Sequence, residues 1–265
     1  MLHPTLLLLV FGLCCSPVLG QDALRRAHAH NDYEHDRPLY DALEHGFVSI
    51  EADIHLRGDT LYIAHDAEDI RPGRTLEALY LAPLYELVAS REGHIYANTP
   101  LLLLIDIKTD AEDTYSALKP LLHRYRSMLT EYTERTTRPG AVSVVLSGNR
   151  PLSMLMAEST RLAAYDGRLS DLETDPPLSP HLMPLVSQNW SAVARWYGGR
   201  HPLPDADRQR LVQYVASAHA LGYQLRFWGT GDNEAVWHEL YGAGVDLLNA
   251  DDLGRLKAFL DAQAR

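Results

Sequence analysis

Short apolar runs alternate with amphipathic segments along the chain from residue 24 onward. Nine of the runs have the length and the aliphatic or β-branched character of strands: 24–29, 48–54, 61–65, 101–107, 142–147, 162–165, 183–187, 223–227 and 245–249. Most intervening segments place apolar residues three or four positions apart, which predicts helices over 38–45, 75–90, 110–128, 150–159, 205–221, 233–241 and 251–262. Alternating strands and helices predict an α/β fold with a mostly parallel sheet.

The third predicted strand, 61–65, is separated from the second only by a tight Arg57-Gly58-Asp59 connection. A parallel crossover needs a dozen or more residues, so these two strands are expected to form an antiparallel hairpin. The other eight strands match the count of a closed (β/α)8 barrel. We therefore predict a TIM barrel with a β-hairpin excursion after its second strand. An open doubly wound sheet is the alternative, and the lack of a glycine-rich phosphate loop after the first strand disfavours it.

The beginning of the chain has the pattern of a targeting segment. Residues 5–13, TLLLLVFGL, form an apolar run too short to span a bilayer, and Val18-Leu19-Gly20 fits a signal-peptidase site. We expect residues 1–20 to be a signal peptide cleaved near Gly20, residues 21–265 to form a single barrel domain, and the protein to be exported to the periplasm or secreted. An uncleaved anchor and a wrongly assigned start are the alternatives. Both cysteines, Cys14 and Cys15, lie in this segment, which excludes thiol catalysis and cysteine-bound zinc in the remainder.

The charge balance limits the classes of partner. Acidic residues outnumber Lys and Arg by 35 to 24, for a formal net charge of −11. A nucleic-acid-binding protein would carry a basic surface, and a polybasic membrane anchor would carry a basic cluster. We therefore expect a small-molecule or lipid-headgroup ligand, no nucleic acid, and no transmembrane span after the signal segment.

Polar residues are concentrated where the predicted strands end. They are His28 and His30, Glu51 and Asp53, His65, Asp106 and Lys108, Arg226 and Trp228, and Asn249. In a barrel, functional side chains come from the carboxyl ends of the strands, and residues two apart on a strand share a face. Three carboxylates converging there would repel one another, and a divalent cation would relieve the repulsion. Their oxygen ligands favour one Mg²⁺ or Ca²⁺ ion.

This set of groups suits phosphoryl chemistry. The metal and Lys108 would neutralise phosphate oxygens, and two histidines could serve as general base and general acid. Each residue taken alone has a structural interpretation, such as a helix cap or a core side chain. The repetition of polar residues at the correct strand end and on the correct face favours a functional site.

The order of these motifs resembles the phosphatidylinositol phospholipase C-like phosphodiesterase superfamily, and within it the glycerophosphodiester phosphodiesterases, including a branch that opens with HxHNDY. The matching positions are a histidine after the first strand, E-x-D on the second, His-Asp closing the hairpin, an acidic-x-Lys strand, a late tryptophan and a final V-D-x-[IL]-x-[TN]-D. Here they are His30, Glu51 to Asp53, His65-Asp66, Asp106 to Lys108, Trp228, and GVDLLNADD over residues 244–252. The resemblance spans residues 28–252.

The resemblance implies a (β/α)8 barrel that cleaves phosphodiesters with one divalent metal. Glu51, Asp53 and Asp106 would be the metal ligands, with His30 as base and His65 as acid in a first step that can yield a cyclic phosphate. Sphingomyelinase D enzymes of spider venom share further positions, which implies that Lys108, Trp228 and Asn249 contact phosphate or line the site.

The chain departs from glycerophosphodiesterases at two places. It has His30-Asn31-Asp32 in place of His-Arg-Gly, so Asn31 or Arg226 would replace the missing phosphate-binding arginine. The third ligand is Asp106 where those enzymes have Glu, and His28 is either a supporting residue or an alternative to His30. Two other functions stay open: an amidohydrolase or polymerase-and-histidinol-phosphatase type of metal hydrolase, and a non-catalytic barrel with a degenerate site.

Overall fold

The computed structural model describes residues 23–264, and these form a closed parallel barrel surrounded by helices. The barrel strands are β1 (Leu24–Ala29), β2 (Phe47–Arg57), β4 (Leu101–Ile107), β7 (Val142–Gly148), β8 (Ala164–Gly167), β9 (Leu185–Asn189), β10 (Gln224–Trp228) and β11 (Leu247–Ala250). They are hydrogen-bonded in this order, and β1 pairs in parallel with both β2 and β11, which closes the ring. The predicted (β/α)8 barrel is confirmed.

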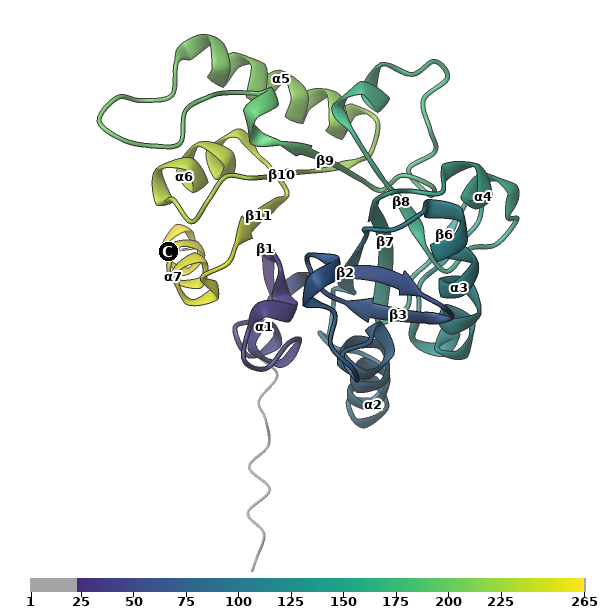
Figure 1. The fold of residues 1–265 in the computed structure, drawn as a ribbon. Coiled ribbons are helices and arrows are strands. Elements are labelled where there is room, and N and C mark those ends of the chain that lie inside the picture. The colour runs from purple at the N-terminus through teal and green to yellow at the C-terminus, as the bar shows by residue number, and fades with distance from the viewer. Residues whose placement is uncertain (1–22, 265) are drawn as a thin grey trace, which may run out of the picture.

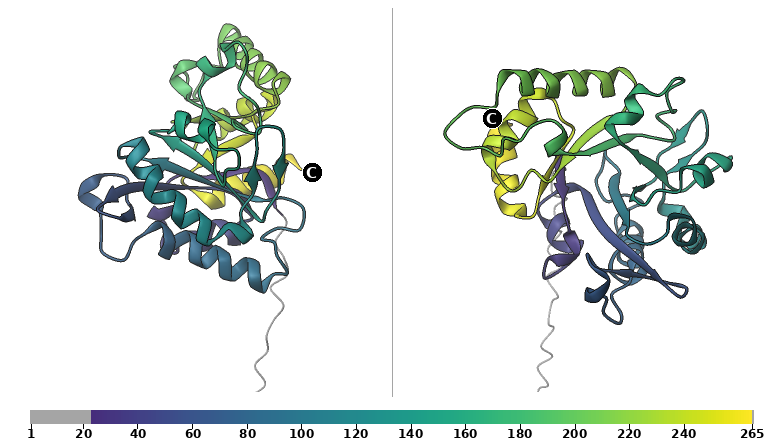
Figure 2. Two further views of the ribbon diagram at one scale, coloured as in Figure 1. Left: turned by 90° about the vertical axis from the view of Figure 1, so that its right-hand side faces the viewer. Right: turned by 45° about the horizontal axis from the view of Figure 1, so that its top comes forward.

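The helices lie outside the ring of strands (Figure 1). They are α1 (Tyr40–Glu44), α2 (Ala82–Ser90), α3 (Ala111–Arg124), α4 (Leu152–Ala157), α5 (Asp205–Ala220), α6 (Glu234–Ala243) and α7 (Leu253–Gln263). Figure 2 shows α5 (green) and α2 (slate blue) at opposite ends of the molecule, with the strands between them. None of the helices formed by residues 23–264 has the length and apolar character needed to cross a membrane.

The hairpin forms as predicted. β3 (Thr60–Ile63) pairs antiparallel with the distal half of β2, from Ile54↔Ile63 to Arg57↔Thr60. β2 therefore runs well past the barrel, and the turn after β3 brings His65 back to the barrel mouth. A short antiparallel ribbon of β5 (Glu131–Tyr132) and β6 (Thr137–Arg138) was not expected from the sequence. Its two-residue strands are too short to give a periodic pattern.

Capping residues set where two of the helices that follow site strands begin. Asp110 caps α3 by accepting the backbone N–H groups of Glu112 and Asp113, each at 3.0 Å. Asp252 caps α7 in the same way, through the N–H of Arg255. Because helices begin at these caps, the preceding residues stay in loops at the carboxyl end of the barrel.

Candidate active site

A cleft of about 530 Å³ opens at the carboxyl ends of the strands. Eight of the ten predicted site residues line it: His30, Asn31, Glu51, His65, Asp106, Lys108, Arg226 and Trp228. Their convergence follows from the parallel sheet, because the carboxyl ends of all eight barrel strands meet at one end. The register also places Asp53 opposite Asp106 on adjacent strands.

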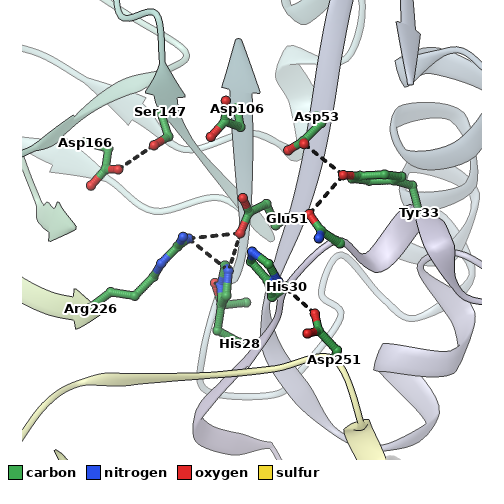
Figure 3. Close-up of polar contacts among 12 residues, drawn as sticks. His28, His30, Tyr33, Glu51, Asp53, Asp106, Ser147, Asp166, Arg226 and Asp251 are labelled. Carbon is green, nitrogen blue, oxygen red and sulfur yellow. Dashed lines mark hydrogen bonds and ion pairs between the residues drawn. The ribbon is translucent and has the colours of Figure 1, made fainter. Parts of the chain in front are cut away.

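Glu51 lines the cleft, and Arg226 and His28 both contact its carboxylate (Figure 3). His28 and Arg226 contact its Oε2, at 2.9 Å from Nε2 and 3.2 Å from Nη1. Nε2 of His28 lies 2.9 Å from both Glu51 Oε2 and Arg226 Nη1, and its Nδ1 lies 2.6 Å from Ser49 Oγ. Burial and the Arg226 charge lower the pKa of His28 to about 3, so this ring is neutral. His28 is thus a supporting residue of Glu51.

The electrostatic consequence is a permanently ionised Glu51. Burial alone would raise its pKa, but the Arg226 charge and the His28 hydrogen bond hold the pKa well below the usual range for glutamate. Arg226 is itself 3% exposed, and its Nε has no hydrogen-bond partner among residues 23–264. Arg226, which was predicted to contact phosphate, thus forms a buried ion pair with Glu51.

Asp53 and Asp106 share one cation. Lys108 Nζ lies 2.9 Å from Asp53 Oδ2 and 3.2 Å from Asp106 Oδ1. Burial and the Glu51 charge raise the pKa of Asp53 to about 6, and burial also raises the pKa of Asp106. The pKa of Lys108 is raised too, because the two carboxylates outweigh the effect of its burial. This half of the cluster carries more negative charge than Lys108 alone neutralises.

The three carboxylates fit a divalent cation. Glu51, Asp53 and Asp106 each offer an oxygen within 4.8 Å of the others. Asp53 Oδ1 is buried and finds no hydrogen-bond partner among the described residues, which is costly for a carboxylate oxygen without a cation. The oxygen-only donor set is the type that Mg²⁺ and Ca²⁺ prefer. These residues are therefore the ones that could hold such an ion.

Both candidate acid–base histidines direct Nδ1 toward a carboxylate. His30 Nδ1 lies 2.7 Å from Asp251 Oδ1, and His65 Nδ1 lies 3.1 Å from Asp53 Oδ2. Burial would lower the pKa of His30, but the hydrogen bond to Asp251 and the charge of Glu51 outweigh it and raise the pKa. The contacts with described residues use Nδ1 of each ring, which leaves Nε2 for a substrate.

Tyr33 connects several of these groups and was missed as a site residue. Its hydroxyl lies 2.8 Å from Asp53 Oδ2, 2.9 Å from Asn31 Oδ1 and 3.2 Å from His65 Nδ1. Asn31 adopts a left-handed conformation with φ of 48°, which asparagine tolerates well and which turns the chain after β1. The sequence contained the signal in the HNDY motif, but two partners of the hydroxyl, Asp53 and His65, come from distant parts of the chain and required the structure.

Asp251 was not predicted to be the partner of His30. It directly follows β11, where an acidic residue before a helix is typical of a cap. The cap of α7 is instead Asp252, and Asp251 is free to contact His30.

Two predicted substrate-binding residues, Trp228 and Asn249, differ in exposure and in the pocket that they line. Trp228 is 37% exposed at the rim of the cleft. Asn249 is buried and lines an adjoining pocket of about 270 Å³ that it shares with His30. Neither side-chain polar atom of Asn249 has a hydrogen-bond partner among the described residues.

The ends of β7 and β8 form a wall of the cleft that sequence reasoning did not identify. Ser147, Asn149 and Arg168 line it, and Ser147 Oγ donates to Asp166 Oδ2 at 2.7 Å (Figure 3). The sequence gives no sign of this wall, because a serine and a single arginine after a glycine form no recognisable motif. Gly148, with φ of 67°, lies where a Cβ would collide with Asp106 Oδ1.

With this geometry established, comparisons with known proteins become informative. Residues 23–166 match a family model described as the AIM6-like phosphodiesterase domain, and residues 224–254 match one for the glycerophosphoryl diester phosphodiesterase family. Among curated proteins, Altered inheritance of mitochondria protein 6 homolog of Arthroderma benhamiae is 31% identical, over 88% of this chain and 82% of its own. Altered inheritance of mitochondria protein 6 of Eremothecium gossypii is 32% identical, over 94% and 76%.

Solved structures agree with the barrel. A glycerophosphodiester phosphodiesterase from Parabacteroides distasonis has a TM-score of 0.57 at 14% identity, covering 92% of this chain and 100% of that one. Phosphatidylinositol-specific phospholipase C from Listeria monocytogenes has a TM-score of 0.51 at 11% identity, covering 90% and 92%. The fold is therefore that of the superfamily which the motifs resembled.

The prediction of export is wrong by the same comparisons. Both curated relatives are named for the inheritance of mitochondria, which points away from an exported protein. The predicted signal peptide, residues 1–20, lies outside the residues that the structure describes.

The family model covers more than half of the chain, and the Arthroderma relative exceeds 30% identity over most of both chains. Together with the barrel and the order of its site motifs, this establishes that the chain belongs to the AIM6-like phosphodiesterase family.

Proposed function

We propose that this protein is a divalent-metal-dependent phosphodiesterase that cleaves a glycerophosphodiester or a phospholipid-headgroup diester. One observation carries the proposal: a single cleft is lined by Lys108, by two histidines and by two members of a cluster of three carboxylates. The contacts of the two histidines with the described residues use Nδ1, which leaves Nε2 for substrate. A site for hydrolysing phosphodiesters needs positive charge at the phosphate and two groups that exchange protons. Glu51, Asp53 and Asp106 would hold one Mg²⁺ or Ca²⁺ ion, which supplies Lewis-acid stabilisation of the phosphate oxygens.

The chain's own residues would carry the proton transfers. His30 takes the proton of the attacking hydroxyl at Nε2, while Asp251 accepts from Nδ1–H and stabilises the resulting imidazolium. The attacking oxygen bonds to phosphorus as the bond to the leaving oxygen breaks. His65 donates a proton from Nε2 to that leaving oxygen. When a neighbouring hydroxyl of the substrate attacks, the product is a cyclic phosphate, which water then opens with the two roles reversed.

Other residues would bind and orient the diester. Lys108 reaches the same cleft and donates to phosphate oxygens from its position between Asp53 and Asp106. Asn31 and Arg226 line the cleft near Glu51 and replace the arginine that related enzymes carry after the first strand. Trp228 forms the rim, and Asn249 borders the adjoining pocket beside His30.

Hydrolysis of bis(p-nitrophenyl) phosphate and of a glycerophosphodiester panel tests the proposal. We expect no turnover in EDTA, recovery with Mg²⁺ or Ca²⁺, and a loss of at least about a hundredfold in His30→Ala. His123→Ala, an exposed helix residue, is the matched control and should leave turnover unchanged. Detection of a cyclic product by ³¹P NMR separates attack by a substrate hydroxyl from attack by water.

Two results would contradict the proposal. Metal binding without turnover of any phosphodiester would favour an amidohydrolase-type or histidinol-phosphatase-type reaction, although β7, β8 and β9 contribute no histidine to the described cleft. A folded protein that neither binds a metal nor turns over a diester would indicate a non-catalytic barrel.

A further inference from the structure

The wall formed by the ends of β7 and β8 has no role in the proton transfers or in metal binding. Ser147, Asn149 and Arg168 belong to it, and they line the same cleft as Lys108 and the two histidines. Figure 3 shows the Ser147–Asp166 pair on the other side of Glu51 from the Tyr33–Asp53 pair. A substrate whose phosphate lies at the acidic cluster can therefore extend its headgroup toward this wall.

Arg168 is held firmly by one edge of its guanidinium group. Nη1 donates to Asp166 Oδ2 at 2.9 Å and to the Gly167 carbonyl at 2.8 Å. Asp166 is fully buried, and Ser147 Oγ fixes the same Oδ2 by a hydrogen bond of 2.7 Å. The side chain is thus positioned before any ligand arrives, which lowers the entropic cost of binding.

The other edge of Arg168 keeps unused donors. Nη2 has one contact with the described residues, Ser147 Oγ at 3.4 Å, and Nε makes none. The side chain is 23% exposed and borders the cleft. A planar guanidinium with free N–H groups along one edge matches a carboxylate or phosphate, because both present two oxygens to the fork.

The local charge also favours an anion. Arg150 Nη1 donates to the Asp166 carbonyl at 2.6 Å, and Arg168 Nη1 reaches the same oxygen at 3.3 Å. Two guanidinium groups therefore converge on one backbone carbonyl oxygen, and Arg168 alone also contacts the Asp166 carboxylate. Asp171 accepts the backbone N–H of Arg168 at 2.7 Å but does not line the cleft. The formal charges of these two arginines and two aspartates sum to zero, but of the four side chains Arg168 alone lines the cleft, so this wall presents a cation to a ligand.

We propose that Arg168 is a specificity residue that binds a second anionic group, a carboxylate or a phosphate, on the headgroup of the substrate. The proposal rests on the proposed function, since it assumes that the scissile phosphate occupies the acidic end of the same cleft. It narrows the substrate class to phosphodiesters with an acidic headgroup, in preference to choline-type or ethanolamine-type headgroups.

Binding of phosphomonoesters tests this without requiring turnover, because a phosphodiesterase does not hydrolyse them. O-phosphoserine and phosphoethanolamine differ only by a carboxylate, and propanediol bisphosphate and propanediol monophosphate differ only by a phosphate. Titration calorimetry of the full chain with Mg²⁺ should show at least about tenfold tighter binding of the doubly acidic member in one pair or both. The pair whose two members differ in affinity shows whether the second anionic group is a carboxylate or a phosphate.

Variants then assign the preference to Arg168. Arg168→Gln should abolish the discrimination while phosphoethanolamine binds as in the wild type, a result that also shows an intact fold and phosphate site. Arg168→Lys should retain part of the preference, because it keeps the charge but not the fork. Arg200→Gln, at an exposed position outside the cleft, removes the same charge and should change nothing.

The outcomes separate the two proposals. Equal affinity of the wild type for both members of both pairs overturns the role of Arg168 alone. Discrimination that survives in Arg168→Gln overturns it as well. If the wild type binds no phosphomonoester, the phosphate site of the proposed function fails, and the specificity role fails with it.

Discussion

Glu51 and Asp106 belong to one acidic cluster, but the protein compensates their charges in different ways. Glu51 is 5% exposed and is bound by Arg226 and by neutral His28. Asp106 is 18% exposed and shares the 25%-exposed Lys108 with Asp53. The buried end is an interlocked ion pair, whereas the end toward the cleft has fewer cations than carboxylates. The difference indicates that stability depends more on the first end than on the second.

The largest expected effect on stability is that of Glu51→Gln. Removing this charge leaves the Arg226 guanidinium buried without a counter-ion, which costs about 3 kcal/mol of unfolding free energy. Urea denaturation measures it. Asp106→Asn is the comparison and should cost under about 1 kcal/mol of unfolding free energy. In this variant Lys108 keeps its ion pair with Asp53 and its contact with solvent, so no buried charge is left unpaired. Equal losses in the two variants would remove the distinction between the ends.

Metal binding should depend strongly on Asp106, although its substitution is expected to cost little stability. A divalent ion at a hundred times its dissociation constant should raise the unfolding free energy of the wild type by about 2.7 kcal/mol. Asp106→Asn should weaken that binding by at least about tenfold, since affinity for hard cations follows the number of charged oxygen ligands. Calorimetric titration with Mg²⁺ and Ca²⁺ measures the change. Asp66→Asn, an exposed carboxylate beside His65, is the control, and an equal loss there would refute the assignment.

The pH profile distinguishes His30 from the cluster. The base must be neutral to accept a proton, so turnover should fall as pH drops through the pKa of His30. That pKa is raised: burial would lower it, but the Asp251 hydrogen bond and the Glu51 charge outweigh burial. Asp251→Asn removes one of these contributions, so the acidic limb of kcat/KM should move to lower pH. We expect a reduction of about tenfold at the optimum. An acidic limb that stays in place would exclude His30 as the base.

The barrel and the acidic half of the site could be predicted because they follow from local patterns. β4 is a mostly apolar run that contains Asp106 and is followed by Lys108, and its boundaries, Leu101–Ile107, are those expected. Period-two alternation placed Glu51 and Asp53 on one face, and parallel strands brought them to the same end as Asp106.

The partners of these residues could not be predicted, because they depend on tertiary contacts. Arg226 reaches Glu51 across a closed barrel, and Asp251 reaches His30 from the last strand to the first. Arg168 follows a short strand in a segment that reads as an irregular loop, so its place in the cleft required the structure. Export was predicted from the apolar run in residues 1–20, and the names of the curated relatives contradict it.

The smallest expected effect is that of Tyr33→Phe. Tyr33 contacts Asp53, one of the two carboxylates that share Lys108. Tyr33→Phe keeps the ring, which is 4% exposed, and removes the hydroxyl that contacts Asp53 Oδ2 and Asn31 Oδ1. Losing this one donor should cost about 1 kcal/mol of stability. It should lower kcat/KM about fivefold, since Asp53 and His65 lose a shared orienting contact.

Tyr80→Phe is the matched control: its hydroxyl donates to Asp32, away from the cleft, so it should reduce stability similarly but leave kcat/KM unchanged. A similar fall in kcat/KM for both variants would mean that Tyr33 supports the fold and not the orientation of His65.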